Sequence, residues 1–109
     1  MKTKSDILQG MLDMLVMRAV ADERLHGYGL LNRLRLISGE RLQIPQGSLY
    51  PALHRLENKG FLKGEWGVTE TGREAKFYSL TSKGRQQLDA EVAEWRELSV
   101  AISLVLGTI

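Results

Sequence analysis

Apolar residues recur every three or four positions in three segments near the start of the chain, and this spacing predicts three helices. The predicted helices cover residues 6–21, 26–38 and 47–59. Because the first is apolar almost all round, we expect it to lie at the centre of the fold. Gly39 and Gly60 follow the second and third helices as stop signals.

Pro51 limits where the third helix can begin, because proline has no N–H and is harmless only in the first turn of a helix. We therefore predict an N-cap near Ser48. At about 100° per residue, one side of this helix carries leucines that are expected to face a core: Leu49, Leu53 and Leu56. The other sides carry outward-facing residues of varied chemistry: Gly47, Ser48, Tyr50, Pro51, His54, Arg55, Asn58 and Lys59.

Two short segments after the third helix predict β-strands, over residues 61–66 and 74–80. Residues 67–73 between them contain two glycines and predict a turn, so the two strands form a hairpin. Three helices followed by a hairpin are the element order of a winged helix-turn-helix. We therefore expect a mainly α fold with a small β-hairpin, with a DNA-binding domain over residues 1–80 and a C-terminal dimerisation helix over residues 81–109.

This fold predicts how the chain would meet DNA. The major groove is about 12 Å wide and admits one α-helix, so the third helix can present its outward side to base edges. The hairpin carries Arg73 and Lys76, which can reach the phosphate backbone or an adjacent groove. Phosphate contacts of this kind position a protein on a duplex, whereas base contacts specify the sequence.

The last predicted helix, over residues 81–106, spans roughly 40 Å at about 1.5 Å per residue, which is longer than a domain of this size is wide. Its apolar residues are spaced alternately four and three apart, and its last two turns are apolar almost all round. An exposed apolar end would favour aggregation, so we expect a second copy to cover it in a twofold homodimer. The expected dimer contacts are Leu88, Val92, Trp95, Leu98, Ile102, Val105 and Leu106.

Charge is divided unevenly along the chain. Residues 1–85 carry fourteen basic and nine acidic side chains, and residues 86–109 carry one basic and four acidic. A basic body indicates a polyanionic partner such as double-stranded DNA. A homodimer would hold two third helices about 34 Å apart, which suits two half-sites on one face of a duplex. We therefore expect a palindromic operator.

Composition excludes several other classes of function. The chain has 109 residues and no cysteine, which rules out a disulfide scaffold, a thiolate zinc site and a cysteine nucleophile. His26 and His54 are its only histidines, too few for a histidine-based metal hydrolase. No nucleophile–base pair or phosphate loop is visible, so we expect neither an enzyme nor a cofactor. The sequence has no membrane span and no signal peptide, which predicts a cytoplasmic protein.

Several stretches resemble the PadR family of bacterial transcriptional regulators. The most specific is Gly47–Glu57 (GSLYPALHRLE), supported by His26–Gly29 (HGYG), Gly72–Thr81 (GREAKFYSLT) and Glu94-Trp95. The resemblance runs from Leu8 to about Leu106. It implies a winged-helix repressor that dimerises through its last helix. It also implies that a small aromatic or drug-like molecule can release the DNA, as in many members of the family.

The resemblance also assigns roles to particular residues. It places Tyr28, Ser48, Tyr50 and Pro51 at or near the DNA, Arg73 and Lys76 on the wing, and Trp95 where flat ligands stack at the dimer centre. The tip residues Thr69-Glu70-Thr71 depart from the more basic or proline-containing tips of many members. The complete set of candidate DNA-binding residues is Tyr28, Gln46, Gly47, Ser48, Tyr50, Pro51, His54, Arg55, Lys59, Arg73 and Lys76.

Each of these assignments has a simpler structural alternative. Tyr28 can equally pack beneath the second helix, and Ser48 and Tyr50 can merely fix the start of the third. Trp95 can be an ordinary residue of the dimer core. His54 can face solvent near the phosphates, and the basic residues of the third helix can be merely solvated.

Two functions are compared on this basis. The first is a sequence-specific DNA-binding repressor, and the second is a winged-helix protein–protein interaction module without its own operator. The module requires an apolar patch on the outward side of the third helix. That side is polar in this sequence, which favours the repressor.

Overall fold

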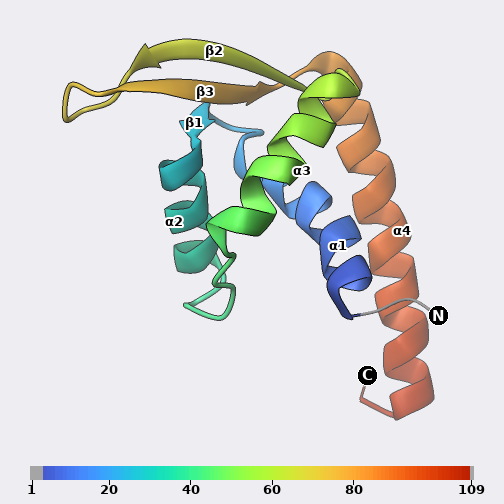
Figure 1. Ribbon diagram of the computed structural model, residues 1–109. Helices are drawn as coiled ribbons and strands as arrows, with labels where there is room; N and C mark the ends of the chain where they lie inside the picture. Colours follow the sequence, from blue (N-terminus) through green and yellow to red (C-terminus); the bar gives the residue numbers. More distant parts are fainter. Residues whose placement is uncertain (1–3, 109) are drawn as a thin grey trace.

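Four helices and a three-stranded antiparallel sheet make up the described part of the chain (Figure 1). This computed structural model describes residues 4–108, with side chains described from Gly10 onward. The elements are α1 (Lys4–Ala19), β1 (Leu25–His26), α2 (Gly27–Ile37), α3 (Gln46–Asn58), β2 (Leu62–Val68), β3 (Glu74–Leu80) and α4 (Ser82–Leu106). The predicted order of three helices, a hairpin and a long helix is confirmed.

The core lies where α1 packs against α2, α3 and α4. Val16 and Met17 of α1 are fully buried in one cluster with Leu49 and Leu53 of α3. The prediction that the first helix is central is therefore confirmed, and so is the leucine side of the third helix. Figure 1 shows α1 between α3 and α4.

The start of α3 differs from the prediction. The predicted N-cap at Ser48 is wrong, because α3 begins at Gln46 and its N-cap is Pro45, which makes no side-chain capping bond. Pro51 is therefore inside the helix and cannot donate the hydrogen bond that the carbonyl of Gly47 would accept. Both residues are exposed, so water can reach that carbonyl, and this explains why the helix continues through Pro51.

Strand β1 has no counterpart in the prediction. It pairs with β3 through Leu25 opposite Tyr78 and His26 opposite Phe77, and β3 lies between β1 and β2. Two residues are too few to show alternation, so this strand exists only because β3 is there to pair with it. His26 then caps α2, since its Nδ1 accepts a hydrogen bond from the N–H of Gly29 at 3.2 Å.

The beginning of α4 belongs to the core of the same chain. Thr81 caps this helix by accepting a hydrogen bond from the N–H of Gly84 at 3.0 Å. Leu88 is only 1% exposed and packs in the main cluster. The prediction that Leu88 contacts a second copy is therefore wrong, because the periodic pattern could not show that the first turns of α4 are already covered by α1.

Candidate nucleic-acid interface

The outward side of α3 is open, as the sequence predicts. Gly47, Pro51, His54 and Asn58 are all exposed, and they lie opposite the buried leucines. Figure 1 shows α3 crossing in front of α1, with nothing drawn in front of it. The structure therefore leaves one complete side of a short, rigid helix free for a partner.

The first turn of α3 adds backbone donors to this surface. The N–H groups of Ser48 and Leu49 bond to the carbonyl of Pro45, which leaves those of Gln46 and Gly47 without a partner inside the helix. Free N–H groups at a helix start attract phosphate oxygens. Besides its chain neighbours and the backbone of its own helix, a Cβ on Gly47 would meet no described heavy atom within 4 Å, so packing in this chain does not require glycine there.

Arg55 and Lys76, two of the predicted DNA contacts, are paired within the chain. The Nη2 of Arg55 lies 2.8 Å from an Oδ1 of Asp13 on α1, and both side chains are partly buried. The Nζ of Lys76 on β3 lies 2.9 Å from an Oε1 of Glu57 on α3. These two pairs tie α3 to α1 on one side and to the hairpin on the other. Sequence reasoning missed both acidic partners.

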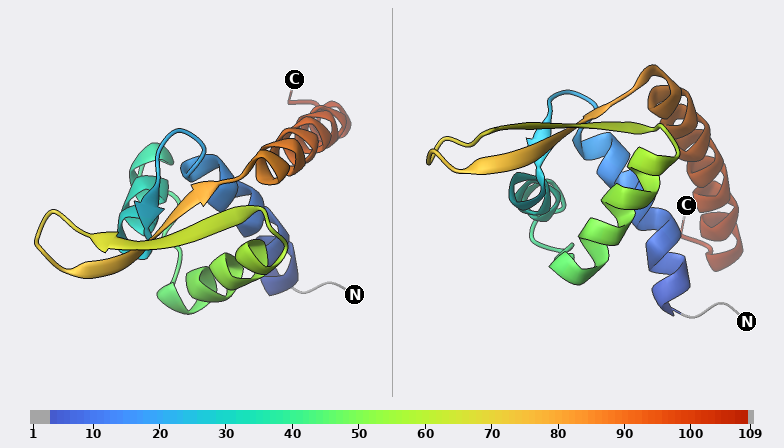
Figure 2. Two further views of the ribbon diagram at one scale, coloured as in Figure 1. Left: turned by 90° about the horizontal axis from the view of Figure 1, so that it is seen from above. Right: turned by 45° about the horizontal axis from the view of Figure 1, so that its top comes forward.

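His54, Lys59 and Arg73 are placed differently. All three side chains are exposed, and within the described residues neither Lys59 nor Arg73 forms an ion pair. His54 and Lys59 share α3 and its C-cap, whereas Arg73 lies far along the hairpin, next to its turn (Figure 2). Of these three predicted contacts, two therefore lie on α3 and its C-cap, and one lies apart on the hairpin.

Two tyrosines flank the start of the interface. Tyr28 of α2 is 71% exposed, so the alternative that it packs beneath its helix is wrong. Tyr50 of α3 is half-exposed, and its ring lies against Gly27 at the beginning of α2. Tyr50 therefore joins α3 to α2, while Tyr28 is free to meet a partner.

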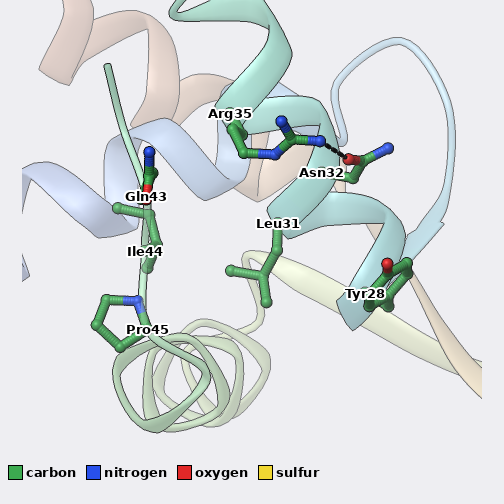
Figure 3. Close-up of a pocket in the computed structure, with 7 residues that line it drawn as sticks. All are labelled: Tyr28, Leu31, Asn32, Arg35, Gln43, Ile44 and Pro45. Atoms are coloured by element: carbon green, nitrogen blue, oxygen red, sulfur yellow. Dashed lines mark hydrogen bonds between the residues drawn. The ribbon is translucent and has the colours of Figure 1, made fainter. Parts of the chain in front are cut away.

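A shallow pocket of about 360 Å³ opens between α2 and the loop that leads to α3 (Figure 3). Its apolar floor is formed by Leu31, Ile44 and Pro45, and Tyr28 stands at one end. The guanidinium of Arg35 is held in place by Asn32 and by Glu40, with each N–O distance 2.6 Å. Because Pro45 is the N-cap of α3, the pocket borders the start of that helix.

The far end of α4 carries a second exposed surface. Figure 1 shows α4 running past the end of α1, so the core of this chain does not cover its last turns. Val92 is half-buried against the core. The other predicted dimer contacts are exposed: Trp95, Leu98, Ile102, Val105 and Leu106.

None of the described helices is long and apolar enough to cross a membrane. Among the same residues, no group of three or more histidine or acidic side chains is arranged to hold a metal ion.

The family model described as "Transcriptional regulator PadR-like family" matches residues 16–90. The chain belongs to this family. PadR-like proteins are DNA-binding transcriptional regulators rather than enzymes. The matched region contains all of α2, α3 and the hairpin, so it includes every candidate DNA contact described above.

Individual relatives agree with this assignment. A transcriptional regulator of Mycobacterium tuberculosis is 34% identical over 84 residues, which are 77% of this chain and 75% of that protein. An uncharacterised protein X of Lysinibacillus sphaericus is 30% identical over 103 residues, 94% of each chain.

Solved structures share the fold along nearly the whole chain. A PadR-like transcription factor from Bacteroides fragilis has a TM-score of 0.77 and 32% identity, covering 94% of this chain and 96% of that one. A transcriptional regulator from Clostridium thermocellum has a TM-score of 0.81 and 25% identity with the same coverage. These matches include the hairpin and most of α4, which supports the winged-helix fold of this PadR-like chain.

The contact between the hairpin and α3 predicts how stability depends on pH. The hydrogen bond from Lys76 to Glu57 raises the pKa of Lys76 above its ordinary value of 10.5, and burial raises the pKa of Tyr78 above 10.0. Both groups hold their protons more tightly when folded. The contribution of the two protonated groups to the stability of the folded state is therefore complete below these ordinary pKa values. It is lost as the pH rises through the raised pKa values.

We expect the free energy of unfolding, measured by urea denaturation, to fall as the pH rises above about 10. The substitution Glu57→Gln should flatten the part of this fall that Lys76 causes, and Tyr78→Phe should remove the part that Tyr78 causes. Glu70→Gln is the control, because Glu70 is exposed at the tip and should leave the profile unchanged. If the Glu57→Gln/Tyr78→Phe double variant loses stability as steeply as the original chain, this account of the contact is wrong.

Proposed function

We propose that this chain is a homodimeric repressor that binds a palindromic operator, with α3 in the major groove of each half-site. One observation carries the proposal: the outward side of α3 is exposed and polar, and it begins with free N–H groups beside Gly47. Glycine loses more conformational freedom on folding than any other residue, so an exposed helix start has no need of it. A close approach of DNA to the backbone explains why glycine stands at this position.

The candidate residues divide into two roles in this proposal. Arg55 and Lys76 hold α3 in position through their ion pairs, and their phosphate contacts are secondary. Tyr50 likewise positions α3 through its contact with Gly27. The proposed direct DNA contacts are Tyr28, Gln46, Gly47, Ser48, Pro51, His54, Lys59 and Arg73.

The proposed dimer uses the end of α4. The last turns of α4 expose large apolar side chains on several sides. Their exposure to water is unfavourable, and a second copy of the same helix can cover them. Residues 81–109 then act as the dimerisation part, and the distance between the two copies of α3 follows from how the two α4 helices pack. A flat aromatic ligand beside Trp95 would change that packing and release the DNA.

Binding to DNA is tested with the duplex upstream of the chain's own gene and a random duplex of equal length. We expect the upstream duplex to bind at least about 10³-fold more tightly, and the logarithm of affinity to fall linearly with the logarithm of salt concentration. Gly47→Ala should leave the stability of the free protein unchanged or slightly raised and yet weaken DNA binding. Fluorescence anisotropy and urea denaturation measure the two effects.

Gly10→Ala is the matched control for this variant. Gly10 is also an exposed helical glycine, and a Cβ there would meet no described atom within 4 Å besides its chain neighbours and the backbone of its own helix. It lies on α1, away from the outward side of α3. Gly10→Ala should not lower stability, and it should leave DNA binding unchanged. Equal affinity for both duplexes without salt dependence would refute the repressor and favour the protein–protein interaction module.

Ile102→Glu should give monomers, because it places a charge on the apolar surface of α4. We expect operator affinity to drop by about 10²-fold or more, since one monomer cannot hold two half-sites together. Val100→Glu is the control: Val100 is 48% exposed and Ile102 49%, but they point to different sides of α4. Sedimentation should show dimers for Val100→Glu, and a monomeric unsubstituted chain would contradict the proposed dimer.

Trp95→Ala tests the proposed release of DNA by a ligand. Without the indole ring, a flat aromatic compound that weakens operator binding should lose most of its effect, while operator affinity in its absence stays nearly unchanged. Coupling between two such sites is typically about 5–150-fold in affinity. The comparison uses operator titrations with and without the compound. A compound that releases both variants equally would show that Trp95 is only a residue of the dimer core.

A further inference from the structure

One row of side chains on the hairpin begins in the core and ends in solvent. Opposed residues of an antiparallel pair share a face, and residues two apart along a strand share it too. Leu62 and Tyr78 lie on one face and are buried in the core cluster beside α3. Trp66 and Val68 continue this row along β2, so they lie on the face of the sheet that is turned toward α3.

The side chain of Trp66 is largely exposed to solvent. It is 73% exposed, and Val68 is also largely exposed. Both residues lie in the second half of β2, and the turn end of the hairpin projects beyond the helices (Figure 2). The residue opposite Trp66 is Lys76, whose side chain is drawn toward Glu57 instead of covering the indole ring. The core does not need Trp66, so its large apolar surface is available to a partner.

The ion pair between Lys76 and Glu57 holds this face at a set angle to α3. Gly64 lies opposite Tyr78 on the same face, and a Cβ there would collide with the Lys76 side chain and lie 2.9 Å from an Oε2 of Glu57. Glycine at this position therefore makes room for the ion pair. As a result, the strand residue opposite Trp66 is anchored to α3.

Electrostatic attraction contributes little to the binding of the hairpin to a polyanion. Residues 62–80 carry three basic and three acidic side chains, and one of the bases, Lys76, is already paired with α3. Lys63 is paired with Glu65 at 3.1 Å on the opposite face of β2. Only Arg73 remains as an unpaired base among the described residues of the hairpin, and it is flanked by acidic residues at 70 and 74.

We propose that Trp66, together with Val68, is the main contact of the hairpin with the duplex that α3 binds, and that its indole ring packs on deoxyribose in the groove beside α3. Sugars present apolar C–H groups in the walls of the minor groove, where apolar side chains are used by other DNA-binding proteins. The ring supplies a large apolar area, and its N–H can donate to an acceptor. This inference rests on the proposed DNA-binding function.

Duplex DNA suits this surface better than a protein partner does. A stable protein–protein interface buries about 800 Å² on each partner, whereas Trp66 and Val68 form a narrow stripe on a thin hairpin. The stripe is turned toward α3, so a duplex held by α3 lies within its reach. A groove in DNA accepts a narrow projecting element of this kind.

The test compares salt dependence in addition to affinity. Trp66→Ala should weaken binding by about tenfold at every salt concentration and leave the slope of log affinity against log salt unchanged, because no counterion is involved. Trp66→Phe should retain most of the affinity. Arg73→Gln should instead reduce the slope by about one, as expected for a lost phosphate contact.

Glu65→Gln is the matched control, because Glu65 is the neighbouring residue on β2 but points to the opposite face. It must not weaken binding. DNA should also change the tryptophan emission of the original chain, and this change should disappear in Trp66→Phe, whose only tryptophan is Trp95. Circular dichroism of each variant checks that the fold is kept.

The outcomes separate this inference from the proposed function. If the original chain does not prefer its operator and shows no salt dependence, the proposed function fails. If it binds the operator and Trp66→Ala binds equally well, only the role of Trp66 is overturned, and a protein partner for the stripe becomes the better explanation. If Trp66→Ala reduces the salt slope, the residue acts through phosphate contacts and the sugar contact is wrong.

Discussion

Burial of one side of α3 against α1 is the contact on which the rest of this structure depends. Leu49 and Leu53 are fully buried there, beside Val16 and Met17 of α1. A single short helix that buries its apolar side must turn the remaining sides outward. The exposed polar surface that we propose for DNA binding is therefore a direct consequence of how the core is packed.

Three further contacts set the orientation of α3. Arg55 pairs with Asp13 of α1, Glu57 pairs with Lys76 of β3, and Tyr50 lies against the start of α2. Partly buried pairs of this kind restrict geometry more reliably than they add stability. Two bases that a count of charges would assign to phosphate binding are thus used to hold the helix, and fewer free cations remain than composition indicates.

The exposed apolar surfaces at the end of α4 and on the hairpin differ in shape. The end of α4 exposes large side chains over its last turns, whereas the hairpin exposes only a tryptophan and a valine along one edge strand. A broad apolar surface is suited to another protein surface, and a narrow stripe on a thin projection is suited to a groove. The same hydrophobic effect therefore favours different partners at the two ends of the molecule.

Spacing along the chain was enough to predict the four helices, the hairpin and the outward side of α3, because helical and strand periodicity are local properties. Local patterns could not reveal that α3 begins early enough to place Pro51 beyond its first turn, that two residues form β1, or that Leu88 is covered by its own chain. Nor could they show that Asp13 meets Arg55 across 42 positions of sequence. Those features depend on which elements meet in space, and only the packed tertiary structure determines that.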